Sequence, residues 1–232
     1  MLQEVDMKLS SKIIFYLSLC AVVFFAVSCV KSEKKPDPLE ITHKVLLETS
    51  EGNITLGLYG NGMPVTVENF IGYVDRGFYN GLIFHRVVKG FVIQGGGLDE
   101  NLNEKETLPP IKLEMPPSAE VKDENGKVTG RKLLISHDKY TLAMARRRDP
   151  DSAASQFYIT LEATNNLDPN PGFDQPNGYA PFGKVLEGFE VVDKIGAKPV
   201  TNKNMYQGVP VENVKIVKMS VVARPQPKEE KK

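Results

Sequence analysis

Hydrophobic and polar residues alternate along several short stretches of this chain, and a two-residue period is typical of β-strands with one buried face. The alternation is clearest at 213–222, and residues 45–50 and 54–59 flank a turn signal at 51–53, which is typical of a hairpin. Five shorter apolar runs are also predicted to be strands, at 83–88, 91–94, 141–145, 156–160 and 182–186. The pattern predicts a mainly β domain, and periodicity alone leaves both a barrel and a sandwich open.

Two segments have the period of an α-helix instead. Residues 64–77 form the first, and Gly77 suits its C-terminal cap. Its apolar residues recur at the spacing that places side chains on one helix face, namely Val67, Phe70, Ile71 and Val74. Residues 189–195 form the second, which ends at Gly196. The chain is therefore predicted to carry two short helices beside its strands.

Residues 115–131 interrupt this pattern with a polar, proline-containing segment that we interpret as an insertion. Within it, Asn125 and Gly126 lie between two valine-containing stretches, and an Asn-Gly pair is a strong signal for a tight hairpin turn. A small β-hairpin is therefore expected there.

The first thirty residues are typical of an export signal. Lys8 and Lys12 precede an apolar stretch from Ile13 to Val27, and small residues lead up to Cys29. The segment resembles a bacterial lipoprotein signal, in which cleavage leaves a lipid-bearing cysteine as the first residue. An uncleaved transmembrane anchor is the alternative, although the stretch is short for a span of roughly 20 residues.

This interpretation divides the chain into four parts. Residues 1–28 are predicted to be a signal peptide, and residues 29–43, which are charged and rich in proline, a flexible tether carrying lipid on Cys29. Residues 44–222 are predicted to be the folded domain, and residues 223–232 a charged, disordered tail. The expected location is the envelope of a bacterium, where the protein would be a membrane-anchored lipoprotein facing the periplasm.

Composition narrows the chemistry. Lysine plus arginine and aspartate plus glutamate both number 29, so no basic surface for nucleic acid is expected. The two cysteines, Cys20 and Cys29, both lie in the first thirty residues, so the folded domain has no thiol nucleophile. The three histidines are far apart in sequence and lack ligand spacing, so neither a metal site nor a cofactor is expected.

One continuous stretch carries a family resemblance. Residues 77–97 read Gly-Phe-Tyr-Asn-Gly-Leu-Ile-Phe-His-Arg-Val-Val-Lys-Gly-Phe-Val-Ile-Gln-Gly-Gly-Gly. This stretch resembles the central signature of the cyclophilin-type peptidyl-prolyl cis–trans isomerases. Further blocks match in the expected order, at 141–146, 155–159, 167–168, 179–183 and 191–195. Several linked blocks in order make a chance match a poor explanation.

The resemblance implies a fold, an activity and a site. The fold is an eight-stranded antiparallel closed barrel capped by two short α-helices. The activity is rotation about X–Pro bonds, with Arg86 and Gln94 as catalytic residues. The substrate-binding residues carried over from the family are Phe91, Val92, Ala145, Tyr158, Leu167 and Tyr179. The implied partners are proline-containing peptides and unfolded exported proteins, and the protein is expected to be a monomer.

Two positions depart from the family pattern. Tyr158 stands where phenylalanine is usual, and its added hydroxyl needs a hydrogen-bond partner if it is buried. Asn166 stands where an aromatic residue is common, which makes one wall of the groove more polar. His85 is expected to point away from Arg86, because neighbouring strand residues face opposite sides.

These departures keep two functions open. The first is an isomerase that assists the folding of exported proteins, and it is favoured because Arg86 and Gln94 are both present. The second is a proline-peptide-binding module or holdase chaperone with little turnover.

Overall fold

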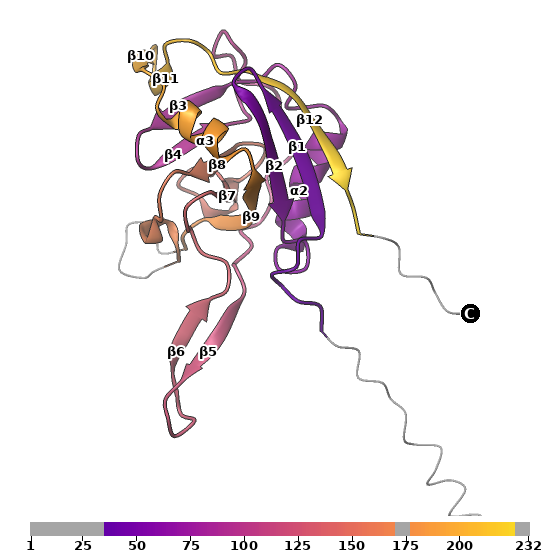
Figure 1. Cartoon of the computed structure of the whole chain (residues 1–232), viewed down its shortest axis with the longest axis vertical. Helices are drawn as coiled ribbons and strands as arrows, with labels where there is room; N and C mark the ends of the chain where they lie inside the picture. The colour runs from indigo at the N-terminus through magenta and orange to yellow at the C-terminus, as the bar shows by residue number, and fades with distance from the viewer. Residues whose placement is uncertain (1–34, 170–176, 226–232) are drawn as a thin grey trace, which may run out of the picture. The chain divides into compact units, whose positions relative to one another are not determined.

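The computed structural model describes residues 35–169 and 177–225, and the part from Pro36 onward forms one compact unit (Figure 1). Its main sheet contains eight strands. They are β1 (His43–Thr49), β2 (Gly52–Leu58), β3 (Phe84–Val88), β4 (Val92–Gly95), β7 (Thr141–Met144), β8 (Phe157–Thr160), β9 (Ala180–Glu187) and β12 (Ile216–Ala223). The predicted mainly β class is thus confirmed.

All neighbouring strands of this sheet are antiparallel, in the order β12-β1-β2-β9-β7-β8-β4-β3. The sheet curls strongly, so its two edges approach each other. An isolated bridge joins Ile83 to Lys215, and the Phe84 amide donates to the Val214 carbonyl at 2.9 Å. The expected eight-stranded antiparallel barrel is therefore confirmed, but it is strongly curled and open rather than closed: its edges meet near one end, and no continuous ladder joins β3 to β12 among the described residues.

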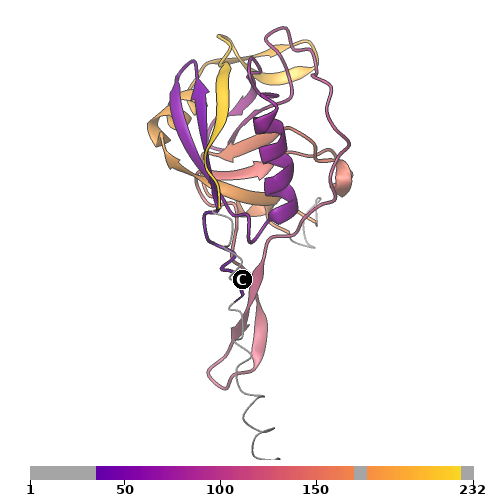
Figure 2. The same ribbon diagram turned by 90° about the vertical axis from the view of Figure 1, so that its right-hand side faces the viewer.

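Helix α2 (Pro64–Asp75) lies across the sheet, as Figure 2 shows, and packs against β9 and β12. Its predicted apolar face is buried, and Phe70 contacts the rings of Tyr79, Phe157 and Phe182 at centroid distances of 5.1–5.7 Å. The helix ends where Gly77 adopts a left-handed conformation (φ +62°) and its amide donates to the Val74 carbonyl. This helix fills the centre of the core.

Helix α3 (Phe189–Gly196) packs against β2, β3 and β4 and buries Val191, Val192 and Ile195. Its N-cap is Gly188, which has a φ of +84°. A Cβ atom at this position would lie 2.3 Å from the carbonyl oxygen of Asn53. Glycine is therefore required both for the backbone conformation and for the close approach to β2.

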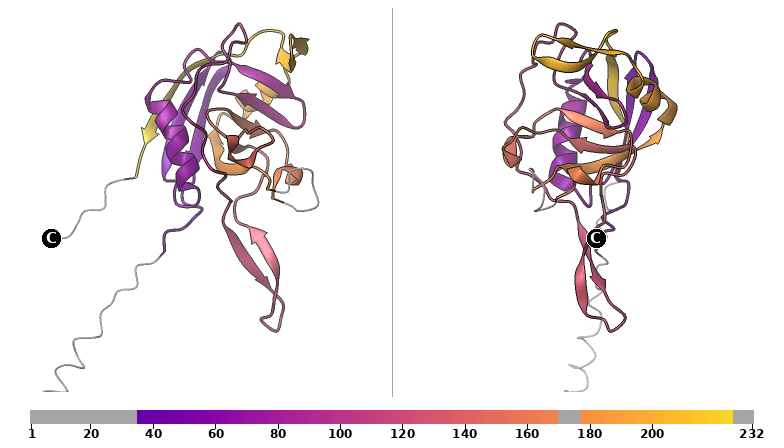
Figure 3. Two further views of the ribbon diagram at one scale, coloured as in Figure 1. Left: turned by 180° about the vertical axis from the view of Figure 1, so that it is seen from behind. Right: turned by 90° about the vertical axis from the view of Figure 1, so that its left-hand side faces the viewer.

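The insertion forms the expected hairpin, with strands β5 (Ser118–Lys122) and β6 (Val128–Leu133). Figure 3 shows it as a separate two-stranded ribbon that extends from the barrel, and most of its residues are exposed. A second hairpin, β10 (Val200–Lys203) and β11 (Tyr206–Pro210), was not predicted, because its sequence is mostly polar. Two 3-10 turns, η1 (Pro150–Ser152) and η2 (Asn165–Leu167), complete the described elements.

Several predictions fall on other parts of the chain. The signal peptide, Cys29 and most of the tail lie outside the described residues. Of the predicted tether, residues 35–43 are described; residues 35–42 contain no helix or strand, and His43 already belongs to β1, so the folded domain begins one residue earlier than predicted. Within 35–169 and 177–225, no helix is long and apolar enough to cross a membrane.

Candidate functional site

Strand alternation places a second apolar cluster on the outer face of the sheet. Ile93, Phe157 and Ile159 point into the main core, so their neighbours Val92 and Tyr158 point outward. The outward cluster buries Val92, Ala143, Tyr158 and Leu167, and Phe91, Ala145 and Tyr179 pack against it while half-buried. All six predicted substrate-binding residues therefore lie in one cluster, although they come from β4, β7, β8, η2 and the segments beside them.

A polar group lies on the strands beside this cluster. Arg86 on β3 and Gln94 on β4 are directly paired across the ladder, and the Arg86 Nη1 atom lies 3.5 Å from the Gln94 Oε1 atom. The Gln94 Nε2 atom donates to the Gln156 Oε1 atom at 2.9 Å. Gln94 is thus held between a permanent cation and a second amide, and Arg86 keeps further N–H donors for a ligand.

Sequence reasoning missed Gln156 and Ala143. Gln156 lies two residues before Tyr158, so alternation along β8 could have placed both on the outer face. Gly97 leaves room for the Gln156 side chain, since a Cβ atom on residue 97 would lie 2.5 Å from the Gln156 Nε2 atom. Ala143 similarly shares a face of β7 with Ala145.

The expected placement of His85 is wrong. A β-bulge between Phe84 and Arg86 breaks the alternation, so His85 does not simply face away from Arg86. The imidazole is buried, approaches Tyr206 on β11, and interacts with the Gln156 side chain. Burial lowers the pKa of His85 to about 4, and the nearby Arg86 cation acts in the same direction.

Arg146 packs over Tyr179 at the edge of the outward cluster and holds the backbone beside it. Its guanidinium carbon lies 4.6 Å from the centroid of the Tyr179 ring. Its Nε and Nη2 atoms donate to the Gly178 carbonyl at 2.9 and 2.6 Å. The same side chain donates to the carbonyls of Arg147 and Arg148, so it links β7 to the segment before β9.

A groove of about 660 Å³ adjoins the cluster and shares Gln94, Ala145 and Gln156 with the site. Arg147 lines it, and Glu104 lines it from the loop after β4. Their side chains form a 3.9 Å ion pair, but both are mostly exposed, so the pair contributes little to stability.

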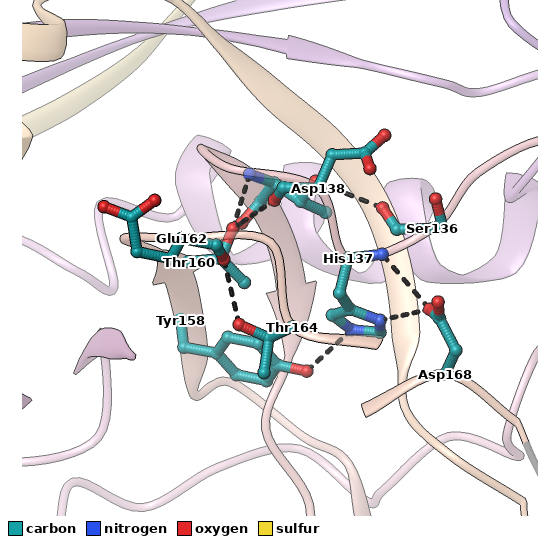
Figure 4. A network of polar contacts seen from close by, with 9 residues as sticks. Ser136, His137, Asp138, Tyr158, Thr160, Glu162, Thr164 and Asp168 are labelled. Carbon is teal, nitrogen blue, oxygen red and sulfur yellow. Dashed lines mark hydrogen bonds and ion pairs between the residues drawn. The ribbon is translucent and has the colours of Figure 1, made fainter. Parts of the chain in front are cut away.

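The tyrosine hydroxyl that the sequence left without a partner has one in the structure. The Tyr158 hydroxyl lies 2.8 Å from the Nε2 atom of His137, and the Nδ1 atom of that ring lies 2.6 Å from Asp168 (Figure 4). His137 is fully buried. Burial raises the pKa of Tyr158 well above its usual value, so the hydroxyl remains protonated.

Taken together, the fold and the site define a curled β-sheet protein with an outward apolar cluster beside the Arg86 guanidinium. Within the described residues, no cluster of three or more histidine, cysteine or acidic side chains is arranged to hold a metal ion. Such a site can seat an apolar ring and donate hydrogen bonds next to it.

Comparison with known proteins gives the family. Residues 44–221 match the family described as cyclophilin type peptidyl-prolyl cis-trans isomerase/CLD. A peptidyl-prolyl cis-trans isomerase of Acinetobacter baylyi is 42% identical over 177 residues, covering 76% of this chain and 84% of that protein. Peptidyl-prolyl cis-trans isomerase B of Escherichia coli is 37% identical, covering 76% of this chain and 98% of that protein. The chain therefore belongs to the cyclophilin-type family, and its activity is peptidyl-prolyl cis–trans isomerisation.

Solved structures agree on the fold. A cyclophilin-type isomerase of Cryptosporidium parvum superposes with a TM-score of 0.59 at 22% sequence identity, covering 79% of this chain and 99% of that one. A second structure of that protein, described as being in the presence of the dipeptide Ala-Pro, gives a TM-score of 0.58.

Proposed function

We propose that this isomerase binds X–Pro segments of polypeptides with the proline ring in the outward cluster and that Arg86 promotes rotation of the bond. The observation that carries the proposal is the position of Arg86 and Gln94 beside the apolar cluster on the outer face of the sheet. Phe91, Val92 and Leu167 supply apolar surface for the ring.

The chemistry requires no covalent step. Amide resonance gives the peptide bond a rotation barrier of about 18–20 kcal/mol. In the twisted state the proline nitrogen regains its lone pair, and a guanidinium N–H can donate to that pair. The donation stabilises the twisted amide more than either planar form, which lowers the barrier. Gln94, which Gln156 orients, would hold the substrate backbone in register with Arg86.

Substitution of Arg86 by alanine tests the assignment. We expect Arg86→Ala to lower kcat/KM on an Ala–Pro peptide by about 10²–10³-fold, the usual cost of one lost transition-state donor. Arg131→Ala, on the exposed strand β6, is the matched control and should retain wild-type activity. Circular dichroism checks that both variants fold.

The assay also separates the two functions left open by the sequence. Wild-type activity in folded Arg86→Ala would remove Arg86 from the mechanism. A wild-type protein that binds the peptide without accelerating exchange would instead fit the holdase alternative.

We further propose that the protein assists the folding of exported proteins from a lipid anchor on Cys29, facing the periplasm. Support comes from the sequence: Lys8 and Lys12 precede an apolar stretch, and small residues lead up to the cysteine. A bacterial lipoprotein cysteine carries a diacylglyceryl group, and two chains give the stable attachment that one chain does not. Unfolded chains emerging at the membrane would then meet the enzyme while their X–Pro bonds still isomerise slowly.

Labelling tests this proposal in the intact chain. Cells expressing the wild type should incorporate labelled palmitate into the protein, and Cys29→Ser should abolish both the label and the cleavage before residue 29. Cys20→Ser is the control and should keep the label, because Cys20 lies within the segment predicted to be removed. An unlabelled wild type, or a mature N-terminus elsewhere, would contradict the anchor and leave the isomerase assignment intact.

A further inference from the structure

His137 is a fully buried histidine with no place in the proposed chemistry, yet it contacts a residue of the proline pocket. Tyr158 belongs to the outward cluster, and its hydroxyl lies 2.8 Å from the Nε2 atom of His137. The Nδ1 atom of the same ring lies 2.6 Å from the Oδ1 atom of Asp168. Figure 4 shows the three side chains in a continuous line from Tyr158 of the outward cluster, through His137, to Asp168 after η2.

The direction of each hydrogen bond follows from the groups involved. Asp168 Oδ1 also accepts the backbone N–H of His137 at 3.1 Å, so this oxygen acts as an acceptor. The imidazole must then carry its proton on Nδ1, which leaves a lone pair on Nε2. The protonated Tyr158 hydroxyl donates to that lone pair. Its hydrogen is thereby directed away from the apolar pocket.

We propose that Asp168 and His137 position Tyr158 for substrate binding, so that His137 is a positioning residue of the isomerase although it does not contact the peptide. This inference rests on the proposed location of the proline pocket. The hydroxyl of a tyrosine at the base of an apolar pocket must be satisfied, or the ring shifts to find water or another acceptor. With the His137 acceptor in place, Tyr158 presents only its ring to the proline.

The groups that face the imidazole are Asp168 from the turn after η2 and Tyr158 from β8. Tyr179 lies behind Tyr158 at a ring distance of 5.8 Å.

Other charges lie farther from this ring. Arg146 lies over Tyr179 and thus two rings away from the imidazole. The carboxylates of Asp138 and Glu162, on neighbouring segments, turn away from the imidazole in Figure 4.

A double-mutant cycle in the full-length chain tests the proposal. The probe is an Ala–Pro tetrapeptide, and NMR exchange spectroscopy gives both its dissociation constant and its catalysed exchange rate. His137→Leu removes the acceptor and leaves the hydroxyl unpaired, so the peptide should bind about fivefold to tenfold more weakly. The exchange rate of the bound peptide should stay within about twofold, because Arg86 is untouched.

Tyr158→Phe supplies the decisive comparison. This variant needs no acceptor, so adding His137→Leu to it should change the peptide affinity by less than about twofold, whatever the affinity of Tyr158→Phe itself. A merely structural role for His137 predicts equal losses in both backgrounds, and that result would overturn the proposal. Wild-type affinity in His137→Leu would overturn it as well.

His137→Gln gives a second readout, because its amide oxygen can accept the Tyr158 hydrogen bond. It should therefore bind the peptide more tightly than His137→Leu, and equal losses in the two variants would refute the inference. The activity of Arg86→Ala tests the proposed chemistry, whereas the peptide affinities of the His137 and Tyr158 variants test this inference. The two can therefore fail separately.

Discussion

Burial controls the chemistry of individual residues around this site. His85 and His137 are both buried, but His137 has hydrogen-bond partners on both ring nitrogens, whereas the Nδ1 atom of His85 has no partner among the described residues. A buried imidazole disfavours its charged form, and the nearby Arg86 cation adds to that effect. His85 therefore links the stability of the fold to pH.

The predicted effect is a loss of stability in acid. The pKa of His85 is about 4 in the folded protein and roughly 6.5 in the unfolded chain, so the unfolded state takes up the proton first as pH falls. This group should therefore cost about 2.5 kcal/mol of unfolding free energy between pH 7.5 and pH 4.5. Urea titrations of wild type and His85→Asn at both pH values measure it.

The difference between the two proteins isolates His85, because every other titrating group is common to both. A loss of equal size in wild type and His85→Asn would show that the imidazole is protonated as easily in the folded state as in the unfolded state.

At the scale of the elements, glycine residues allow a helix and a strand to approach each other closely. Gly188 begins α3 in a left-handed conformation and touches β2, whereas Gly72 lies inside α2 with open space where a Cβ atom would be. The same substitution should therefore have opposite effects at the two positions.

Gly188→Ala should lower the free energy of unfolding by about 2 kcal/mol or more, through the left-handed backbone and the contact with the Asn53 carbonyl. Gly72→Ala should raise it by about 0.5–1 kcal/mol, because alanine is the better helix former. Chemical denaturation at neutral pH measures both. Equal losses in the two variants would mean that the contacts of α3 with β2 do not set the cost.

At the scale of the whole molecule, one continuous part of the chain contains both the hydrophobic core and the candidate site. The core cluster lies entirely between Val45 and Met219, and every residue of the outward cluster lies within the same span. Residues from Pro36 onward form one compact unit. The part of the chain that contains the isomerase should therefore fold without the N-terminal segment.

A chain limited to residues 36–225 should keep its kcat/KM within about twofold and its melting temperature within about 2 °C of the full-length protein. Calorimetry and the Ala–Pro exchange assay on both chains check this. A truncated chain that fails to fold would show that residues 1–35 or 226–232 contribute to the stability of the barrel.

The sequence by itself determined the strands with clear alternation, both helices and the hairpin at 115–131. Its family signature also predicted that Arg86 lies beside a group of apolar residues. These features depend on local periodicity or on a continuous signature, so a single segment carries the signal. Phe91 and Val92 belong to the same signature, and the family order of the later blocks added Tyr158, Leu167 and Tyr179. The catalytic and binding roles of these residues remain predictions that the experiments above test.

Only the tertiary structure decided the rest, because it depends on contacts between distant segments. The β-bulge before Arg86 changed the direction of His85, and no local pattern announces it. The β10–β11 hairpin is mostly polar and forms where β11 packs against β3 and buries Val209. His137 and Tyr158 are 21 residues apart. His137 lies just before β7, and the antiparallel pairing of β7 with β8 brings this segment to the one hydroxyl that the sequence had left without a partner.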